Sequence, residues 1–299
     1  MIEQALYEHL QQQAVLSPYL AKYDDQPAIF NQEAPADSDE LWHNGPQYGR
    51  IVFAVDIQGD PERTMGGTLV VDIMCKEDEE QYPEDIEPII RKLIHGYFFS
   101  RGRFTVAAQW KNSSYFTQPT DQIKGCAVSF ELLAFPYLST IGETDVIDRF
   151  NEWTCDNFDT LYVINHNELP DSAWKPERGE SAVYWRLVTD NPAGWIPDTF
   201  QTIWRTATVR GHIFSKDKDR AATVAKAIIK KLYVDKRIRR EDDVSPIVVN
   251  RRNTLDIGAD VLRKGQITVE ATYGELVHFE NTETLNHISY NLGGEERSV

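Results

Sequence analysis

The sequence has no long apolar run, few cysteines and a shortage of basic residues, and each of these excludes a class of protein. No stretch approaches the ~20 apolar residues that a membrane-spanning helix requires. The only cysteines are Cys75, Cys126 and Cys155, and an odd number at wide spacing argues against a disulfide framework and against a zinc knuckle. We therefore expect buried thiols in a reducing compartment. Glu3 stands where a signal peptide would carry a basic region, which argues against secretion.

Basic residues are outnumbered by acidic ones. The sequence has 31 lysines and arginines and 47 aspartates and glutamates, which gives a formal net charge of −16. An acidic surface repels phosphate backbones, so the chain as a whole is not expected to hold nucleic acid. The excess is uneven: residues 1–140 hold 21 acids and 10 bases, whereas the remainder holds 26 acids and 21 bases. The simplest consequence of this charge is solubility.

The 299 residues are enough for two domains, and a weak internal repeat of about 140 residues supports that division. Five elements recur in the same order: an amphipathic helix, two strands, a second helix and an alternating closing strand. They are expected at residues 3–12, 51–57, 67–76, 89–93 and 127–133 in the first half, and at 145–155, 182–188, 205–216, 228–232 and 267–273 in the second. Duplication explains this shared order better than chance does.

The second helix of each half carries the clearest match. Ile89-Ile90-Arg91-Lys92-Leu93 recurs as Ile228-Ile229-Lys230-Lys231-Leu232, 139 residues later. In the first half, Pro83 and Glu84 suit the first turn of the helix and Gly96 can end it. Such a five-residue phrase is common in helices, so the inference depends on the order of all five elements.

The predicted fold class is α+β, with two tandem copies of a mostly antiparallel sheet and helices packed on one face of each. A further strand is expected in each half, at residues 104–110 and 247–249. The domains are predicted to span residues 1–140 and 141–299. Residues 137–144 form a linker too short to act as a long flexible tether.

The sequence contains no pattern typical of an enzyme, so we expect no catalytic, cofactor-binding or metal-binding residues. It lacks a phosphate-binding loop and a nucleophile elbow, and Gly66-Gly67 and Gly293-Gly294 are interpreted as turns. The seven histidines are scattered without the helical spacing of metal ligands. Residues 101–103, Arg-Gly-Arg, are either a phosphate contact or a polar turn between a helix and a strand, and the turn is favoured.

Equivalent regions of the two halves carry opposite charge. Residues 77–87 contain seven acids and no base, and their acidic run is Glu77, Asp78, Glu79 and Glu80. Residues 216–240 contain ten bases, among them Lys226, Lys230, Lys231, Arg237, Arg239 and Arg240. This reversal favours a contact between unlike neighbouring domains, which fixes partner choice although each surface pair contributes only ~0–1 kcal/mol. The alternative is two unrelated solvated faces.

Three long polar segments, residues 33–48, 189–203 and 280–299, are expected to make intermolecular contacts. Loops on a rigid sheet commonly carry binding residues, and Trp42 and Trp195 are amphipathic anchors within otherwise polar loops. The alternative is that both tryptophans cover the core of their own domain.

The start of the chain combines an amphipathic helix with a short extended segment. The helix is Met1-Ile2-Glu3-Gln4-Ala5-Leu6-Tyr7-Glu8-His9-Leu10, and it is followed by Leu16-Ser17-Pro18-Tyr19-Leu20 and by Ala28-Ile29-Phe30. With the β-hairpin, helix and final strand expected after it, this order resembles the tail terminator (tail-completion) proteins of tailed phages. The resemblance covers about residues 1–137, and the second half is then a diverged copy.

The resemblance implies a ring that caps the tail tube, stops its polymerisation and joins the tail to the head connector. Family members usually have one such domain per chain and form six-fold rings, whereas this chain has two. Either three chains then form a pseudo-six-fold ring, or six chains form a ring with a second tier. The implied partners are other copies of the chain, the tail tube protein and head–tail connector or neck proteins, with DNA only as passing cargo and no membrane.

The implied location is the tail–neck region of the virion, after assembly in the host cytoplasm. The same duplicated fold also suits a non-viral oligomeric binding module or assembly chaperone without catalysis. A weaker alternative is an enzyme whose site is assembled between subunits. Only the ring hypothesis requires a closed annulus or a cap bound to a tail.

Overall fold

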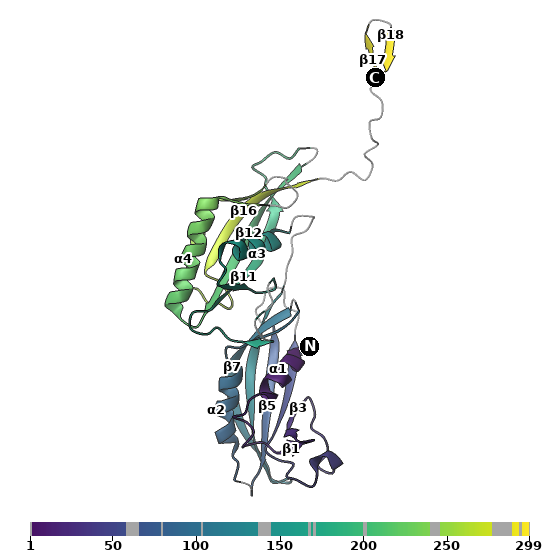
Figure 1. The fold of residues 1–299 in the computed structure, drawn as a ribbon, viewed down its shortest axis with the longest axis vertical. Helices are drawn as coiled ribbons and strands as arrows, with labels where there is room; N and C mark the ends of the chain where they lie inside the picture. Colours follow the sequence, from purple (N-terminus) through teal and green to yellow (C-terminus); the bar gives the residue numbers. More distant parts are fainter. Residues whose placement is uncertain are drawn as a thin grey trace.

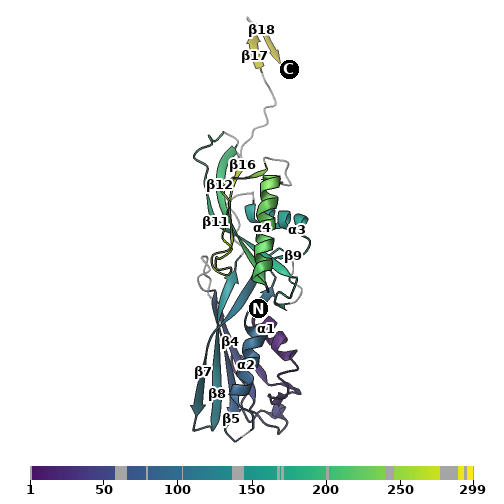
Figure 2. The ribbon, with the colours of Figure 1, turned by 90° about the vertical axis from the view of Figure 1, so that its left-hand side faces the viewer.

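The computed structural model describes residues 2–57, 66–78, 80–102, 104–136, 145–166, 169, 172–199, 202–239, 246–276, 289–292 and 295–298. Most of them form two β-sheets that lie end to end along the long axis of the molecule (Figure 1). Two helices cover each sheet, and Figure 2 shows all four on the same side of the molecule. The predicted α+β class, with two sheets and helices on one face of each, is confirmed.

The first sheet has the strand order β10-β6-β7-β8-β5-β4-β3. Its elements and covering helices are α1 (Ile2–Gln11), β3 (Ile29–Asn31), β4 (Arg50–Ile57), β5 (Gly67–Lys76), α2 (Pro83–Ile94), β6 (Phe98–Arg101), β7 (Phe104–Gln118), β8 (Ile123–Phe135) and β10 (Ala173–Trp174). All neighbouring strands are antiparallel except β3 and β4. A two-stranded hairpin of β1 (Lys22–Tyr23) and β2 (Gln26–Pro27) and the 3-10 helix η1 (Glu40–Trp42) flank β3.

The second sheet has the order β13-β14-β16-β12-β11-β9, and β15 also pairs with β16. Its elements and covering helices are α3 (Val146–Asn157), β9 (Leu161–Val163), β11 (Ser181–Pro192), β12 (Thr202–Ser215), α4 (Lys218–Asp235), β13 (Arg237–Ile238), β14 (Ile247–Val249), β15 (Thr254–Leu255) and β16 (Ile267–Leu276). Here β9 and β11 form the parallel pair. A separate hairpin of β17 (Ser289–Leu292) and β18 (Glu295–Ser298) follows.

The two sheets share one topology. The order β3-β4-β5-β8-β7-β6 in the first corresponds to β9-β11-β12-β16-β14-β13 in the second, with the parallel pair at the same edge. In each half one helix precedes this parallel edge strand, and the other connects the third strand to the fourth along the chain. The five predicted elements, and the further strand, are therefore present in the predicted order in both halves.

One strand crosses the predicted domain boundary. β10 lies in the second half of the sequence but pairs with β6, with Ala173 opposite Phe99 and Trp174 opposite Phe98. The boundary at residue 140 therefore does not fully separate the two sheets, and two residues are too few for a periodic pattern to reveal the strand. The predicted linker, residues 137–144, lies outside the described residues.

Of the turns predicted at glycines, the structure confirms one and contradicts another. Gly102 has φ +62° between β6 and β7, as a polar turn requires, and Arg103 lies outside the described residues. Gly67, however, begins β5 instead of forming a turn, because it pairs with both Ile57 and Leu132, and the backbone nitrogen of Gly66 donates to the carbonyl oxygen of Leu132. A Cβ on Gly66 would lie only 2.3 Å from the backbone nitrogen of Ala134, so close backbone packing is what requires glycine here. Residues 293 and 294 are not described.

The helix ends follow the expected chemistry. Pro83 occupies the first turn of α2, and Gly96, two residues past the end of the helix at Ile94, has φ +79°. In the second half, the Asp145 carboxylate accepts hydrogen bonds from the backbone nitrogens of Ile147 and Asp148, at 3.0 and 3.1 Å, and so caps α3.

Each half has its own core between sheet and helices. Alternate residues of β5, namely Leu69, Val71, Ile73 and Cys75, pack beneath α1 and α2. In the second half, residues of β12 and β16 pack in the same way beneath α3 and α4. Cys75 and Cys126 are buried and Cys155 is partly buried, and none of the three forms a disulfide. Burial raises the pKa of Cys126 to about 11, so it packs as an uncharged side chain. Among the described helices, none is both long and apolar enough to cross a bilayer.

Candidate functional site at the joint between the two sheets

The joint between the sheets is an aromatic cluster of side chains that point away from the helices. Even-numbered residues of β8 pack beneath the helices, so Phe135 projects from the opposite face. By the same alternation, Tyr184 of β11 and Phe214 of β12 project from the helix-free face of the second sheet. The ring centroid of Phe135 lies 5.2 Å from that of Tyr184 and 5.3 Å from that of Phe214, both edge-to-face. Such pairs contribute ~0.5–1.5 kcal/mol beyond the area they bury.

Polar bonds cross the same joint. The Asn165 side chain donates from Nδ2 to the carbonyl oxygen of Phe135 at 2.7 Å, and this bond is buried. The Nη2 of Arg263 lies 2.8 Å from both carboxylate oxygens of Glu131. The joint therefore combines apolar burial with contacts that fix orientation.

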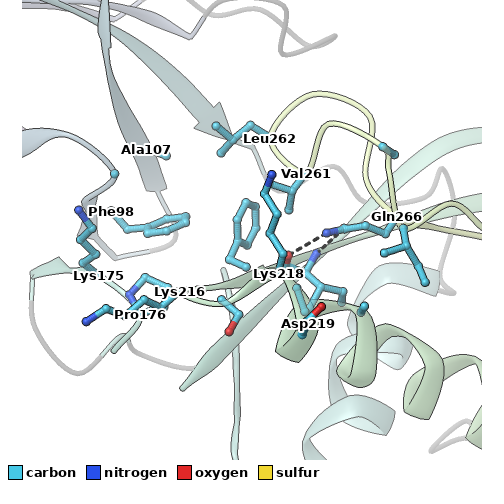
Figure 3. A pocket seen from close by; sticks show the side chains of 18 of the residues that line it. Phe98, Ala107, Lys175, Pro176, Lys216, Lys218, Asp219, Val261, Leu262 and Gln266 are labelled. Atoms are coloured by element: carbon cyan, nitrogen blue, oxygen red, sulfur yellow. Dashed lines mark hydrogen bonds between the residues drawn. The ribbon is translucent and has the colours of Figure 1, made fainter. Parts of the chain in front are cut away.

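A groove of about 580 Å³ opens beside this joint. Figure 3 shows Phe98 and Ala107 of the first sheet on one side and Val261 and Leu262, from the loop between β15 and β16, on the other. The basic side chains on its rim are Lys175 from the segment after β10, Lys216 from the connection between β12 and α4, and Lys218 from the start of α4. The groove thus has an apolar floor and a basic rim.

Gln266 fixes one wall of this groove because its side-chain amide pairs with the backbone of a strand, as a neighbouring strand would. Its Oε1 accepts from the backbone nitrogen of Ile213 at 2.9 Å, and its Nε2 donates to the Ile213 carbonyl oxygen at 3.0 Å (Figure 3). A side-chain amide can replace a paired residue in this way because it carries both a donor and an acceptor. Nearby, the Nδ1 of His212 lies 2.6 Å from the carbonyl oxygen of Val261, which ties the same loop to β12.

Lys175 connects the groove to the end of α2. Its Nζ donates to the carbonyl oxygen of His95 at 2.7 Å, just past the helix C-terminus, where a cation is favourable. Burial lowers the pKa of Lys175, and the nearby Lys216 lowers it further. Burial also lowers the pKa of His95, and Lys175 and Arg91 add to that effect. The ammonium of Lys175 is therefore already hydrogen-bonded to a backbone carbonyl, and its role is structural.

The groove has the chemistry of a binding surface. Asp219 is the one carboxylate among its lining residues, and it lies beside lysines on the first turn of α4. No cluster of three or more His, Cys, Asp or Glu side chains able to hold a metal ion occurs among the residues that the structure describes. An apolar floor with a basic rim suits an acidic, partly apolar polypeptide segment.

The acidic candidates lie at the end of the first sheet away from the joint. Glu77, Asp78 and Glu80 are exposed in the loop between β5 and α2, and the backbone nitrogen of Glu77 donates to the carbonyl oxygen of Gln122 at the β7–β8 turn. Glu79 lies outside the described residues. The C-terminal end of α2, in contrast, borders the groove through Gly96.

The basic candidates lie mainly on and after α4, toward the opposite end of the molecule. Lys226 and Lys230 are exposed one helical turn apart, and Arg237 and Arg239 are exposed beyond the helix. Lys231 is instead half-buried and forms a 2.6 Å ion pair with Asp235. Arg240 is not described. Because the first turn of α4 lines the groove, its C-terminal half points away from the first sheet, and a contact with the acidic loop requires another chain.

Of the two tryptophans, one is a core residue and the other is exposed. Trp42 is only 2% exposed, its rings lie against Tyr23 and Phe30, and its Nε1 donates to the carbonyl oxygen of Ala36 at 3.0 Å. The proposed role of Trp42 as an intermolecular anchor is therefore wrong, because its own domain already buries it. Trp195 is 68% exposed in the loop between β11 and β12, which keeps it a candidate contact.

The sequence reasoning missed the residues that hold the joint. Lys175, Gln266 and Arg263 lie in loops without periodic pattern, and nothing local indicates their partners. It also missed Arg186 and Arg210, which directly face each other across β11 and β12. The alternation of apolar and polar residues along these strands was the available signal, since it places both arginines on the helix-free face. In comparisons with known proteins, no family model, curated protein or solved structure matches this chain.

Proposed function

We propose that this chain is a structural virion protein that caps a phage tail tube as a ring, ends its polymerisation and joins the tail to the head connector. The observation that carries the proposal is the duplicated topology: each chain brings two sheets of identical strand order, held by an aromatic joint. A rigid pair of equivalent units suits a symmetric assembly, in which the same contact is repeated until a ring closes. The resemblance of residues 1–137 to tail terminators agrees with this role.

The arrangement of the halves allows both possible rings. The sheets lie end to end along the long axis, with their helices on the same side (Figures 1 and 2). If that axis lies along the ring axis, six chains form a ring with two tiers, in which one tier contacts the tail tube protein and the other contacts the connector or neck proteins. If that axis lies along the circumference, three chains form one tier in which first and second sheets alternate.

The net charge of the chain agrees with a ring through which DNA passes without being bound. The chain carries a net charge of −16, and an acidic lumen repels phosphate and avoids trapping DNA in transit. The proposed location is the tail–neck region of the virion after assembly in the host cytoplasm, and no catalysis is part of the role.

Negative-stain microscopy and light scattering of the purified chain test the proposal. We expect a closed annulus with the mass of three or of six chains, and labelled antibody against the chain should bind the neck end of the tails. Purified tails incubated with the protein should also stop adding tube subunits. A compact dimer or monomer that never closes, and that does not bind tails, would contradict the ring and favour the binding module or chaperone.

A further inference from the structure

The helix-free face of the second sheet carries two arginines side by side. Arg186 on β11 and Arg210 on β12 are directly opposite in the strand register, while their sequence neighbours Trp185 and Gly211 belong to the helix-covered face. Like charges directly opposite each other on one sheet face destabilise the pair. The arrangement therefore requires compensation by negative charge.

Nothing within the described part of the chain supplies that compensation. Neither guanidinium has a hydrogen-bond or ion-pair partner there, and the Nε of Arg186 is buried without an acceptor. A buried donor left unpaired is unfavourable unless a group outside the chain, either another protein surface or an ordered water, accepts from it. Glu270 lies on that face, diagonal to Arg210, and already accepts a hydrogen bond from Asn250 at 2.8 Å.

The helix-free face of the first sheet carries the complementary feature. Asp72 lies on β5, the strand that corresponds to β12, and its register neighbours on that face are Val52 and Ala127. Within the described residues its half-buried carboxylate has no partner, and burial raises its pKa. Among the other charged residues on this face, Glu131 pairs with Arg263, Arg50 pairs with Asp37, and Lys76 donates to the carbonyl oxygen of Asp121.

The same two faces already pack on each other at the joint. There, Phe135 of the helix-free face of the first sheet contacts Tyr184 and Phe214 of the helix-free face of the second. Away from the joint, Asp72, Arg186 and Arg210 are each partly exposed in the single chain. A second copy is therefore the partner that extends an existing kind of contact.

We propose that the helix-free face of the second sheet docks onto the helix-free face of the first sheet in a second copy of this chain, with Arg186 and Arg210 enclosing Asp72. Each chain then offers one donor face and one acceptor face. Such a head-to-tail contact alternates first and second sheets, so it propagates around the one-tier ring of three chains until that ring closes. The inference rests on the proposed function, because it requires that copies of this chain assemble.

Charge reversal tests the contact. The variants are Arg186→Glu with Arg210→Glu, Asp72→Arg, and all three together; Arg251→Glu with Arg252→Glu, on an exposed loop, is the matched control. We expect the double and the Asp72 variants to raise the dissociation constant of the assembly by roughly a hundredfold, as the loss of a desolvated charge pair does. The triple variant should recover most of the affinity, and the control should assemble like the parent. Mass photometry over a dilution series measures each assembly.

The outcomes separate this contact from the proposed function. If the parent forms a ring and the double variant forms it equally well, the contact is wrong and the ring stands. If the parent stays monomeric, both are wrong. If the double variant loses binding to duplex DNA but still assembles, the arginines bind phosphate and the contact between copies is overturned. Should the glutamates prevent folding, Arg186→Gln with Arg210→Gln replaces them, and parent-like assembly of that variant overturns the proposal.

Discussion

Arg263 and Glu131 are 132 residues apart in the chain, yet the guanidinium of one lies 2.8 Å from both carboxylate oxygens of the other. Glu131 belongs to β8 of the first sheet, and Arg263 lies in the loop that leads into β16 of the second. The same arginine also lies 3.4 Å from the Asp260 carboxylate. This ion pair connects the two halves beside the aromatic joint and the groove.

Replacing Glu131 with Gln should weaken this connection only modestly. Because the two side chains are 45% and 25% exposed, solvent screens the pair, and we expect a loss of ~0.5–1 kcal/mol in the free energy of unfolding. A double-mutant cycle with Arg263→Ala, measured by denaturant unfolding, isolates the coupling, which should shrink as salt is added. Additive single effects at low salt would show that the pair contributes nothing.

The aromatic joint should be far more important for stability. Phe214→Ala removes a buried ring that packs against Phe98 and Phe135, and we expect a loss of about 3–5 kcal/mol. Calorimetry should then show two separate transitions in place of one, because the halves lose their common interface. Phe53→Ala, in the core of the first half, is the matched control and should destabilise without separating the transitions. A single transition in both variants would contradict this role of the joint.

The stability of the first half should depend on pH through His9. The Nε2 of His9 lies 2.9 Å from the carbonyl oxygen of Leu93 and so ties α1 to α2. Burial lowers the pKa of His9, although the bond to Leu93 opposes this effect. Because the unfolded chain binds the proton more readily, stability should be full above the unfolded pKa of ~6.5 and fall as pH drops through it toward the folded pKa.

Thermal melts between about pH 5 and 8 measure this dependence. His9→Gln should flatten the profile over that range, whereas His166→Gln, at an exposed position of the second half, should leave it unchanged. An unaltered slope in the His9 variant would show that other groups control the pH dependence.

The two tryptophans should respond oppositely to truncation. Trp42→Ala removes a buried indole and should cost about 3–5 kcal/mol of stability. Trp195→Ala, at a 68% exposed position, should change stability by less than about 0.5 kcal/mol but weaken assembly. Chemical denaturation and light scattering on the same samples measure both quantities. Unchanged assembly of the Trp195 variant would remove that residue from the interface.

The exposed lysines of α4 test the predicted contact with the acidic loop of a neighbouring chain. Lys226→Glu with Lys230→Glu should reduce oligomer size at low salt and have a smaller effect at high salt, where the screening length falls below ~8 Å. Lys231 is not used because its partner is Asp235. Oligomers of parental size at both salt concentrations would show that this helix face is merely solvated.

Much of the fold could be predicted because it depends on local periodicity. The alternation Leu69, Val71, Ile73, Cys75 identifies a strand with one buried face, and Pro83 marks the start of the helix that follows. Helix α4 was found in the same way, through the repeated apolar and basic phrase. The strand β10 carries no such signal, because it has only two residues and forms its bonds with a strand far away in the sequence.

The candidate site was mostly beyond prediction from sequence. Charge runs identify exposed residues such as Lys226 and Lys230, but they do not show which end of the molecule carries them. The residues around Trp42 have the composition of an exposed loop. The β1–β2 hairpin and β3 nevertheless place Tyr23 and Phe30 against its ring. Neighbouring residues in the sequence did not indicate this burial.

The sequence by itself determined the α+β class, the duplicated order of elements and the opposite charges of the two α-helical regions, because periodicity and composition act over a few residues. Only the tertiary structure decided that two helix-free faces meet at Phe135 and Tyr184, and that Arg186 faces Arg210 while Asp72 stands alone on the other sheet. These relationships depend on strand register and on contacts between distant segments. The partners of a side chain depend on which distant segments fold against it. Its immediate neighbours in the sequence do not specify those segments.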